Sequence, residues 1–600
     1  MGYIGDVELK QLIEAMPSRN TTLDLFKGIA IIAVILYHAG LLTYGYLGVE
    51  IFLVIGGYLI TKSIVHTYEK GDFSYWNYLC KRLVRLWPLA LIITVLSLVG
   101  GYFTMLPDAY KNTCETAIGS ATFTNNFVQY ITAGNYWDTS NDYKPLMHTW
   151  YLGVIFQFYI LYPLVFMLCH GLSHNFIKTS RKVLVSVFFL SLAFYLFPKT
   201  DTAADFYLLP SRLFEFAVGG ILALPAKRSL IGNEEKVFVA FLILAGVLMG
   251  VNEAFNMMKV RLLLAVFLAA LVILYSERNV SMTLWGQKIC SVLAMFGAAS
   301  YSLYLWHQVV LAFWRYDVSD EFSFVTYVVV IMLSLIIGLF SYRFVENKIT
   351  SFAKTGRYGV YKVMGACLVT TCITSVFALK YYRTQGVVQD IPELDVRLDT
   401  PSSWAPQEYN ARITEMFEKP LPVSENGKKK VLVVGDSYAR DWINVLLEGG
   451  LDNVNLLYAK DVPIDLRERI AWADVIFVAN NAPIDRYVDY LPAMMQKKFY
   501  RVGHKAFGRG IGCAYNQARL TNNYSSFVVS AHDAINEEER IEFSGMYINL
   551  MDSLRNADGS ISLFTTDKKL ISHDGIHLTR AGAQELAKRI NVRRFVEEYK

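Results

Sequence analysis

The chain has 600 residues, of which 54% are hydrophobic and only 18% are charged, and its net charge is +5. This composition is typical of a protein that lies largely in a lipid bilayer, and it excludes an ordinary string of water-soluble domains. The small net charge gives no support for nucleic acid as a partner. Seven cysteines without a CxxC spacing indicate neither a zinc site nor a disulfide framework, so no metal site is expected.

Long apolar runs recur up to residue 380. A helix that crosses about 30 Å of hydrocarbon needs roughly 20 residues, and about eleven runs come close to this length. They lie near residues 24–42, 47–65, 86–105, 150–169, 183–198, 208–225, 237–251, 260–275, 293–314, 324–342 and 360–380. Lys and Arg gather in the loops that share a side with the N-terminus, which predicts a cytoplasmic N-terminus. An odd number of spans then predicts that residues 381–600 lie on the opposite side of the membrane from the N-terminus.

Ionisable residues interrupt the first two apolar runs. Lys27 and His38 are eleven residues apart, close to three helical turns, so both lie on one face of the first helix. Such groups are costly in hydrocarbon, and several together indicate a polar cavity. Lys27 either holds the phosphates of a donor or anchors the helix at the interface, whereas His38 is predicted to be a base or transient acyl carrier. We expect Glu50, in the second run, to orient or tune His38.

Arg82 and Arg85 precede the third run, either as a positive-inside anchor or as a site for an anionic, phosphorylated donor. Polar residues also occur in three later strings, PLMHTWYL, FYLLPSRLFEFAVGG and SYSLYLWHQ. These strings supply the remaining candidates for a membrane site, namely His148, Trp150, Tyr207, Arg212, Glu215, Tyr301 and His307. The i, i+3 spacing of Arg212 and Glu215 favours an ion pair between the two side chains.

The pattern changes after residue 382. Residues 383–428 contain scattered prolines and one helix-like piece, YNARITEMF, which is typical of a linker. From residue 429, the strings KKKVLVVGDS, WADVIFVANN and KKFYRVGHKAFG predict buried strands, and TRAGAQELAKRI predicts an amphipathic helix. Strands that alternate with helices predict a parallel sheet covered on both faces.

The predicted fold is therefore a multi-pass α-helical membrane domain followed by a soluble α/β domain. The helical part comprises about ten helices plus one linking helix. The predicted boundaries are 1–350 for the membrane domain, 358–382 for the linking helix, 383–428 for the linker and 429–600 for the α/β domain.

Three residues of the predicted α/β domain carry the chemistry of a nucleophilic site. Ser437 follows a buried strand on a tight turn that Gly435 permits, where backbone amides can stabilise an oxyanion. Asp574 and His577 are three residues apart, so one short turn can present a base and its orienting carboxylate. The competing interpretation is a helix-capping turn and an unrelated surface turn. The order Ser, Asp, His within one domain favours the catalytic interpretation.

The VVGDS and DGIHLTRAGA strings resemble the first and last blocks of the SGNH (GDSL-like) hydrolase superfamily over about residues 430–595. This resemblance implies an SGNH-like fold with Ser437 as nucleophile, His577 as base and Asp574 as its orienting group. The middle blocks of the superfamily have no clear counterpart, because no GxND string is present. The candidates for the oxyanion hole, beside Ser437 itself, are Asn480 or Asn481 and Gly450 or Gly503.

The apolar half resembles the acyltransferase-3 family of membrane O-acyltransferases over about residues 22–345. Six motifs occur in the order of that family: Lys27 with His38, Glu50 in GVEIFLVIGGYLI, the Arg82–Pro88 segment, PLMHTW, SRLFE and SYSLYLWH. One departure is that HTWYLGVIFQFY stands where the family commonly has HTWSLAVEEQFY. Tyr151, Ile155 and Phe156 thus replace a serine and two glutamates.

The two resemblances together imply a bacterial inner-membrane protein that acetylates an extracytoplasmic glycan such as O-antigen, peptidoglycan or exported polysaccharide. Acetyl-CoA would be the co-substrate, with no bound cofactor, and Lys27, Arg82 and Arg85 would hold it. Ser437 would accept the acyl group before transfer, or the SGNH-like part would only position the glycan. Two rivals stay open: a membrane-tethered carbohydrate esterase, and a polytopic transporter with an accessory domain. No feature of the sequence specifies an oligomeric state.

Overall fold

The computed structural model describes residues 21–132, 141–197, 203–225, 258–275, 284–355, 358–399, 406–421, 427–451, 453–481, 484–508, 510–524, 527–528 and 533–597. Contacts divide the chain into two compact units, which we call the helical unit and the α/β unit. The helical unit comprises Met1–Gly101, Asn112–Trp314 and Phe322–Lys380. The α/β unit comprises Tyr102–Lys111, Arg315–Glu321 and Tyr381–Lys600.

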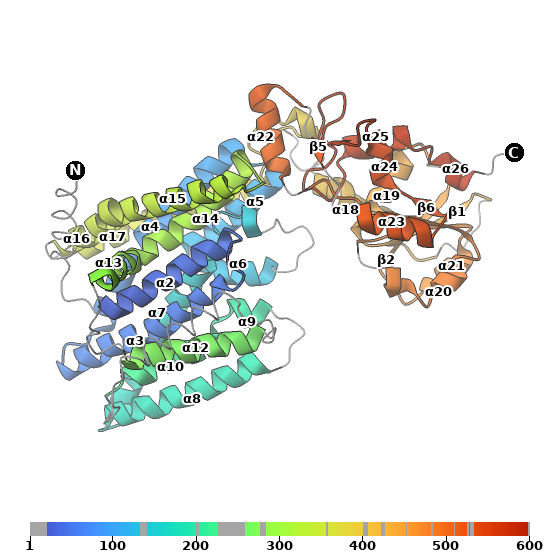
Figure 1. The fold of residues 1–600 in the computed structure, drawn as a ribbon. Helices are drawn as coiled ribbons and strands as arrows, with labels where there is room; N and C mark the ends of the chain where they lie inside the picture. Colours follow the sequence, from blue (N-terminus) through green and yellow to red (C-terminus); the bar gives the residue numbers. More distant parts are fainter. Residues whose placement is uncertain are drawn as a thin grey trace. The chain divides into compact units, whose positions relative to one another are not determined.

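The helices of the helical unit form a bundle in which the longer ones lie side by side (Figure 1). They are α2 (Thr21–His38), α3 (Gly48–Glu69), α4 (Tyr75–Thr104), α5 (Pro107–Ala121), α6 (Asn125–Thr132), α7 (Trp150–Leu172), α8 (Phe176–Leu196), α9 (Ala203–Tyr207), α10 (Leu213–Ala223), α12 (Met258–Tyr275), α13 (Leu284–Ala298), α14 (Ser300–Asp317), α15 (Phe324–Ser341), α16 (Asn347–Lys354) and α17 (Gly359–Arg383). A 3-10 turn, η3 (Met147–Thr149), precedes α7.

Six helical stretches in the described part of the chain are long and apolar enough to cross a membrane: Gly45–Glu69, Tyr75–Thr104, Met147–Leu172, Phe176–Leu196, Phe324–Lys354 and Gly359–Arg383. Each coincides with a predicted run, so a membrane domain is supported, whereas the expected number of eleven spans stays a prediction. Helices α2, α10 and α12 occupy three further runs. The run 237–251 lies outside the described residues.

One predicted run was wrong in detail. Residues 293–314 were expected to form one helix, but α13 ends at Ala298 and α14 begins at Ser300. The apolar pattern continues across this break, so it carries no signal of the interruption. Helices α5 and α6 were not predicted, because both are too polar to stand out as apolar runs.

Glycines bring neighbouring helices of the bundle into close contact. A Cβ atom on Gly28 would lie 1.9 Å from the carbonyl oxygen of Leu293, and one on Gly297 would lie 1.7 Å from that of Asp24. Helices α2 and α13 therefore approach backbone to backbone, as small residues allow in membrane bundles. Gly57 and Gly219 do the same for α3 and α10.

The α/β unit is built on a five-stranded parallel sheet with the order β2-β1-β3-β4-β6. Its strands are β1 (Lys430–Gly435), β2 (Asn455–Lys460), β3 (Val475–Ala479), β4 (Lys498–Val502) and β6 (Tyr547–Ile548). A second, antiparallel pair joins β5 (Phe527–Val528) to β7 (Ile561–Ser562). The prediction of a parallel sheet is confirmed, but β2 and β6 were missed.

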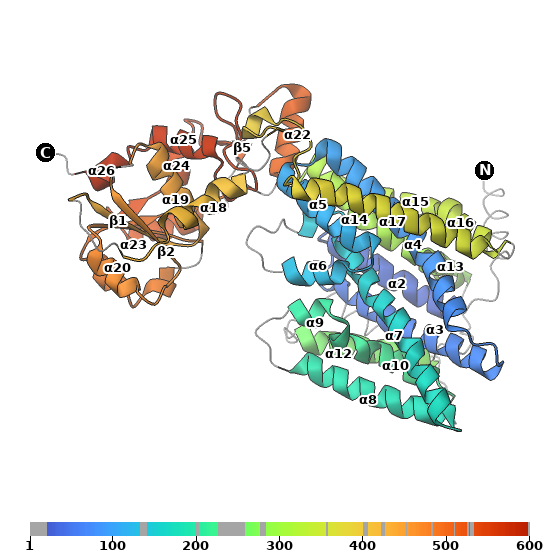
Figure 2. The same cartoon turned by 180° about the vertical axis from the view of Figure 1, so that it is seen from behind.

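Helices cover both faces of the parallel sheet (Figure 2). They are α18 (Pro406–Phe417), α19 (Ser437–Glu448), α20 (Leu466–Trp472), α21 (Leu491–Met494), α23 (Asp533–Glu542), α24 (Leu550–Leu554), α25 (Arg580–Arg589) and α26 (Arg593–Val596), whereas α22 (Ile511–Thr521) lies apart from the sheet. Val433 of β1 belongs to the same buried cluster as Trp442 of α19, and its neighbour Val434 belongs to the cluster of Ile470 in α20. The uninterrupted apolar sequence of β1 follows from burial on both sides.

Two short segments from the region of the apolar helices complete the α/β unit. The backbone N–H of Leu106 donates to the Tyr316 hydroxyl at 2.6 Å. The Asn516 amide of α22 donates to the Thr104 carbonyl and to the Asp317 carboxylate, both at 3.0 Å. Residues 102–111 and 315–321 were expected to belong to the membrane domain alone.

Candidate active sites

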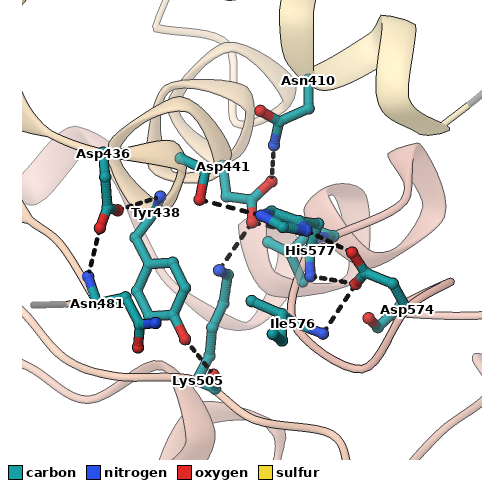
Figure 3. Close-up of polar contacts among 12 residues, drawn as sticks. Asn410, Asp436, Tyr438, Asp441, Asn481, Lys505, Asp574, Ile576 and His577 are labelled. Carbon is teal, nitrogen blue, oxygen red and sulfur yellow. Dashed lines mark hydrogen bonds and ion pairs between the residues drawn. The ribbon is translucent and has the colours of Figure 1, made fainter. Parts of the chain in front are cut away.

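The turn after β1 presents Ser437 as the first residue of α19. Gly435 has φ of +143°, and a Cβ atom there would lie 1.8 Å from the Ala479 carbonyl oxygen, so the turn requires glycine. The Asp436 carboxylate accepts from the N–H of Tyr438 at 2.9 Å and from that of Asn481 at 2.8 Å (Figure 3). Asp436 thus caps the helix and ties the turn to the end of β3.

Ser437, His577 and Asp574 come together as the sequence predicted. The Ser437 hydroxyl lies 3.0 Å from His577 Nε2, and His577 Nδ1 lies 2.5 Å from Asp574 Oδ2. Asp574 Oδ1 accepts from the backbone N–H groups of Ile576 at 2.9 Å and His577 at 2.7 Å. Because an ionised carboxylate only accepts, His577 Nδ1 carries the proton and Nε2 faces the hydroxyl as an acceptor. This geometry suits removal of a proton from Ser437.

Electrostatics keep Asp574 ionised. Burial alone would raise the pKa of this carboxyl, but the His573 and His577 imidazoles and the hydrogen bonds from His577 outweigh burial. The pKa of Asp574 is therefore held well below its usual range. The carboxylate is available to orient His577 throughout the neutral range of pH.

The loop that carries Asp574 and His577 is fixed by backbone contacts. Gly575 has φ of +87°, and a Cβ atom there would lie 1.8 Å from the Gly508 carbonyl oxygen. Its N–H donates to the Ser572 hydroxyl at 3.0 Å, and its carbonyl accepts from the N–H of Phe507 at 2.7 Å. The loop is thereby fastened to the segment that follows β4.

A buried ion pair joins the segment that follows β4 to α19. Lys505 Nζ lies 2.8 Å from Asp441 Oδ2, and both side chains are almost completely buried. Asp441 also accepts from the N–H of Leu578 at 3.2 Å and from the Asn410 amide. Asp441 lies one helical turn after Ser437, so this pair fixes the distance between the nucleophile and the His577 loop.

Two of the four oxyanion candidates are wrong. Gly503 donates its backbone N–H to the Ile548 carbonyl at 2.9 Å, so this group is already used by the strand ladder. Gly450 lies beyond the opposite end of α19 from Ser437, and its N–H donates to the Leu447 carbonyl at 3.0 Å. Glycines were considered only for their small size, which carries no information about where their amides point.

The two asparagines follow β3, at the same edge of the sheet as Ser437. Asn480 is buried, and its side-chain oxygen accepts from Arg501 Nη1 at 2.8 Å. Asn481 is exposed, and its backbone N–H is taken by Asp436. Of the two, Asn480 has an amide whose orientation is fixed, with its oxygen turned to Arg501. Asn480 therefore stays the candidate for a side-chain donor, beside the backbone N–H of Ser437.

Arg501 was not among the sequence candidates, although a charged residue within the apolar string KFYRV was a usable signal. Its side chain is fully buried and donates to Asn480, to Glu539 at 2.7 Å and to His504 Nε2 at 3.1 Å. Glu539 lies in α23, far along the sequence from Asn480. The sequence of β4 by itself gives no information about such a distant partner.

His573, Asp574 and His577 are the one group of described residues whose potential metal-binding atoms all lie within 4.8 Å of one another. Two of these atoms already share the 2.5 Å contact between His577 and Asp574. We therefore interpret His577 and Asp574 as a hydrogen-bonded pair with His573 beside it, and we assign no metal to the group.

The helical unit contains a second candidate site, which we call the histidine cluster: His38, His148 and His307. The ring of His307 lies 5.1 Å from that of His38 and 5.3 Å from that of His148, centre to centre. His38 ends α2, His148 lies in η3 and His307 in α14. Three of the predicted membrane-site residues thus meet, with Tyr304 packed edge-on against His148 at 5.2 Å.

Backbone carbonyls set the tautomers of two of these histidines. His148 Nε2 lies 3.1 Å from the Leu305 carbonyl oxygen, and His307 Nδ1 lies 2.6 Å from that of Tyr304. A carbonyl oxygen can only accept, so each of these nitrogens carries a proton. In the neutral rings, His148 Nδ1 and His307 Nε2 then have free lone pairs, and both are buried without a hydrogen-bond partner among the described residues. Such nitrogens can accept a proton or bond to an acyl carbon.

Glu50 takes part in a different group from the one predicted. Arg212 Nη1 donates to Glu50 at 3.0 Å and to Glu215 at 3.1 Å, and all three side chains are buried. The expected pair of Arg212 and Glu215 is present. Glu50 was expected to orient His38, but it shares this guanidinium instead, because a buried carboxylate requires a cation.

The proposed donor-binding cations have partners of their own. Lys27 lies 2.5 Å from Asp24. Arg85, which is 45% exposed, lies 3.8 Å from Glu346, and Arg82 lies over the ring of Tyr78 at 5.5 Å. A role of these residues in donor binding stays a prediction.

The remaining membrane candidates serve packing and backbone contacts. Trp150 packs against Tyr207 at 5.6 Å, and the Tyr301 hydroxyl donates to the Leu86 carbonyl at 2.5 Å. Phe156, at the position of a family glutamate, stacks on Phe123 at 4.8 Å. An apolar contact thus occupies the place where the family commonly has a charge.

The comparisons with known proteins concern mainly the helical unit. A family model described as an acyltransferase domain matches residues 20–343, more than half of the chain. The chain belongs to the acyltransferase-3 family. Its family match ends before β1, so it says nothing about the α/β unit.

Individual relatives of this acyltransferase-3 protein agree with that assignment. It is 28% identical over 349 residues to the O-acetyltransferase OatA of Staphylococcus aureus (strain NCTC 8325 / PS 47), covering 54% of the chain and 56% of OatA. It is 26% identical over 370 residues to BcsY of Komagataeibacter xylinus, provisionally named a membrane-bound transacylase, covering 61% of the chain and 92% of BcsY. The chain spans little more than half the length of the S. aureus relatives. No solved structure matches the chain.

Proposed function

We propose that the chain moves an acetyl group from a cytoplasmic acyl-CoA donor to hydroxyl groups of an extracytoplasmic glycan, with Ser437 as acyl acceptor in the second stage. The proposal rests on two groups of side chains in one chain: the histidine cluster among apolar helices, and Ser437 with His577 and Asp574 in the α/β unit. Membership of the acyltransferase-3 family and the O-acetyltransferase names of relatives support acyl transfer.

In the first stage, the histidine cluster acts on the thioester of the donor. An unprotonated imidazole nitrogen either takes the proton of an attacking hydroxyl or bonds to the acyl carbon as the CoA thiolate leaves. Lys27, Arg82 and Arg85 would hold the phosphates of CoA. The proposal places the N-terminus in the cytoplasm of a bacterial cell and residues 381–600 on the other side of the inner membrane.

In the second stage, the Ser437 oxygen attacks the carbonyl carbon of the acyl group that the first stage supplies. His577 Nε2 takes the serine proton and returns it to the leaving group as the old acyl bond breaks. A sugar hydroxyl then attacks the acyl-serine, gives its proton to His577, and Ser437 recovers that proton as its ester bond breaks. The backbone N–H of Ser437 and the Asn480 side chain stabilise the oxyanion in both steps.

Mass spectrometry of surface polysaccharide tests the proposal. Cells with the intact chain should carry the mass increment of one acetyl group on sugars that cells without it lack. His38→Ala and Ser437→Ala should each remove this increment, whereas His66→Asn, an exposed histidine of α3, should retain it. Acetylation at the normal level in Ser437→Ala would indicate direct transfer by the helical unit. Acetylation unaffected by both substitutions would refute the proposal.

A further inference from the structure

His573, the first residue of the HDGIH string, has no part in the contacts of Ser437 with His577, yet its side chain is only 3% exposed. It lies between two carboxylates. His573 Nδ1 is 2.7 Å from Asp108 Oδ2, and His573 Nε2 is 3.9 Å from Asp574 Oδ2. Its ring is nearly parallel to that of His577, with centres 6.4 Å apart. A buried cation between carboxylates is thus placed directly behind the orienting group of the base.

Asp108 comes from a distant part of the sequence, since it lies in the first turn of α5, within Tyr102–Lys111 of the α/β unit. Several contacts hold this segment. The preceding N–H of Leu106 donates to Tyr316, and a Cβ atom on Gly386, which has φ of +76°, would lie 1.9 Å from the Pro107 carbonyl oxygen. The position of Asp108 is therefore set by backbone packing and not by its ion pair with His573 alone.

We propose that Asp108 completes the Ser437 site as a positioning residue, holding His573 as an imidazolium that keeps Asp574 ionised and aligned with His577. The inference rests on the proposed role of Ser437 as nucleophile and deepens it. The site is then assembled from two segments, around Asp108 and around His573, that are far apart in the sequence. Residues 429–600 alone lack one of its charged groups.

The charges around His573 agree with an imidazolium at neutral pH. Burial by itself lowers the pKa of His573, but Asp574, Asp108 and Asp441 together raise it to about 9. Among the described residues, the titratable ring of His577 lies 6.4 Å from that of His573, and Lys505 is paired with Asp441. Because the folded-state pKa is raised, the contribution of the cation is present at neutral pH and is lost as the pH rises through about 9.

Deprotonation of His573 would leave the carboxylates of Asp108 and Asp574 facing each other without a cation, which should disturb the alignment of His577. We expect the reactivity of Ser437 to fall as the pH rises through that range. In Asp108→Asn, one of the carboxylates that stabilise the His573 imidazolium is absent. The fall in the reactivity of Ser437 should therefore begin about one pH unit lower. In His573→Gln, the rate should be reduced, and this alkaline transition should disappear.

The experiment measures the rate at which a fluorophosphonate probe labels Ser437 in the detergent-solubilised full chain, across neutral and alkaline pH. In this reaction, the serine oxygen bonds to phosphorus, fluoride leaves, and His577 takes the serine proton. Asp108→Glu, which retains the carboxylate, should restore the position of the transition. Asp317→Asn is the matched control, since its carboxylate binds Asn516 in the same unit.

The outcomes distinguish the role of Asp108 from the proposed role of Ser437. A lowered transition in Asp108→Asn, its recovery in Asp108→Glu and an unchanged profile in Asp317→Asn would support the inference. Labelling of Ser437 with one and the same pH profile in Asp108→Asn and the unaltered chain would overturn it and leave the proposed function standing. Absence of His577-dependent labelling of Ser437 in the unaltered chain would overturn both.

Discussion

The histidines of the two units are held in different ways. His577 in the α/β unit is oriented by the Asp574 carboxylate at 2.5 Å, and its free nitrogen faces the Ser437 hydroxyl. His148 and His307 in the helical unit are oriented by backbone carbonyls at 3.1 and 2.6 Å. The helical unit has buried carboxylates as well, but Glu50 and Glu215 are bound to Arg212.

This difference indicates two kinds of chemistry. A carboxylate stabilises the imidazolium that forms when His577 takes a proton, so the site can pass a proton back and forth as an ester forms and breaks. A neutral carbonyl fixes the tautomer of an imidazole but gives little compensation for positive charge in a buried setting. The histidine cluster is therefore suited to present neutral, nucleophilic nitrogens, and the Ser437 site to repeated proton transfer.

Asp574→Asn should have the largest effect among the substitutions that test this comparison. An amide at this position favours the wrong tautomer of His577, so the rate of fluorophosphonate labelling of Ser437 should fall by about 10³- to 10⁴-fold at neutral pH. Because the carboxylate belongs to the α/β unit, loading of acyl groups by the helical unit should persist. Quenched-flow labelling and transfer from radiolabelled acetyl-CoA to protein measure the two effects separately.

The control for this prediction is Asp552→Asn, which changes an exposed carboxylate of the same unit that binds Asn549 and Arg555. In Asp552→Asn, Ser437 should be labelled at the same rate as in the unaltered chain. If Asp574→Asn also labelled at that rate, the carboxylate would have no role in orienting His577, and the contrast between the two units would fail.

Much of this arrangement could be predicted from the sequence, because the decisive signals are local. Ser437 follows an apolar strand and a glycine, and Asp574 and His577 share one short string, so a single turn presents both. The parallel sheet followed in the same way from strands that alternate with helices.

Contacts between distant segments could not be predicted from the sequence. Glu50 was assigned to His38 because the two are near in sequence, whereas its partner Arg212 becomes close only when α3 packs against α10. The contact of Asp108 with His573 likewise depends on the folded position of residues 102–111. Strand β2 was missed because NLLYAK is short and only partly apolar, so its place beside β1 is decided by pairing.

His307→Gln tests the other side of the comparison and should have a smaller effect. Glutamine fills much of the same space but has no basic nitrogen, so transfer of acetyl groups to glycan should fall by about 10²- to 10³-fold. The rate of Ser437 labelling should not change, because the probe bypasses the helical unit. His66→Asn should leave both rates unchanged. A parallel loss of Ser437 labelling in His307→Gln would show that the two sites are not chemically separate.

Arg501→Lys should have the smallest effect. It retains the buried charge beside Glu539 but loses the planar guanidinium group with its several N–H donors. Lysine cannot contact Asn480 and Glu539 with the same geometry, so the Asn480 amide should lose part of its fixed orientation. We expect the rate of Ser437 labelling to fall by about 10-fold, less than the loss of a whole oxyanion donor. Arg486→Lys, an exposed residue bound to Asp461, is the control and should leave the rate unaltered. An unchanged rate in Arg501→Lys would remove the support for Asn480 as a donor and leave stabilisation of the oxyanion to the backbone N–H of Ser437.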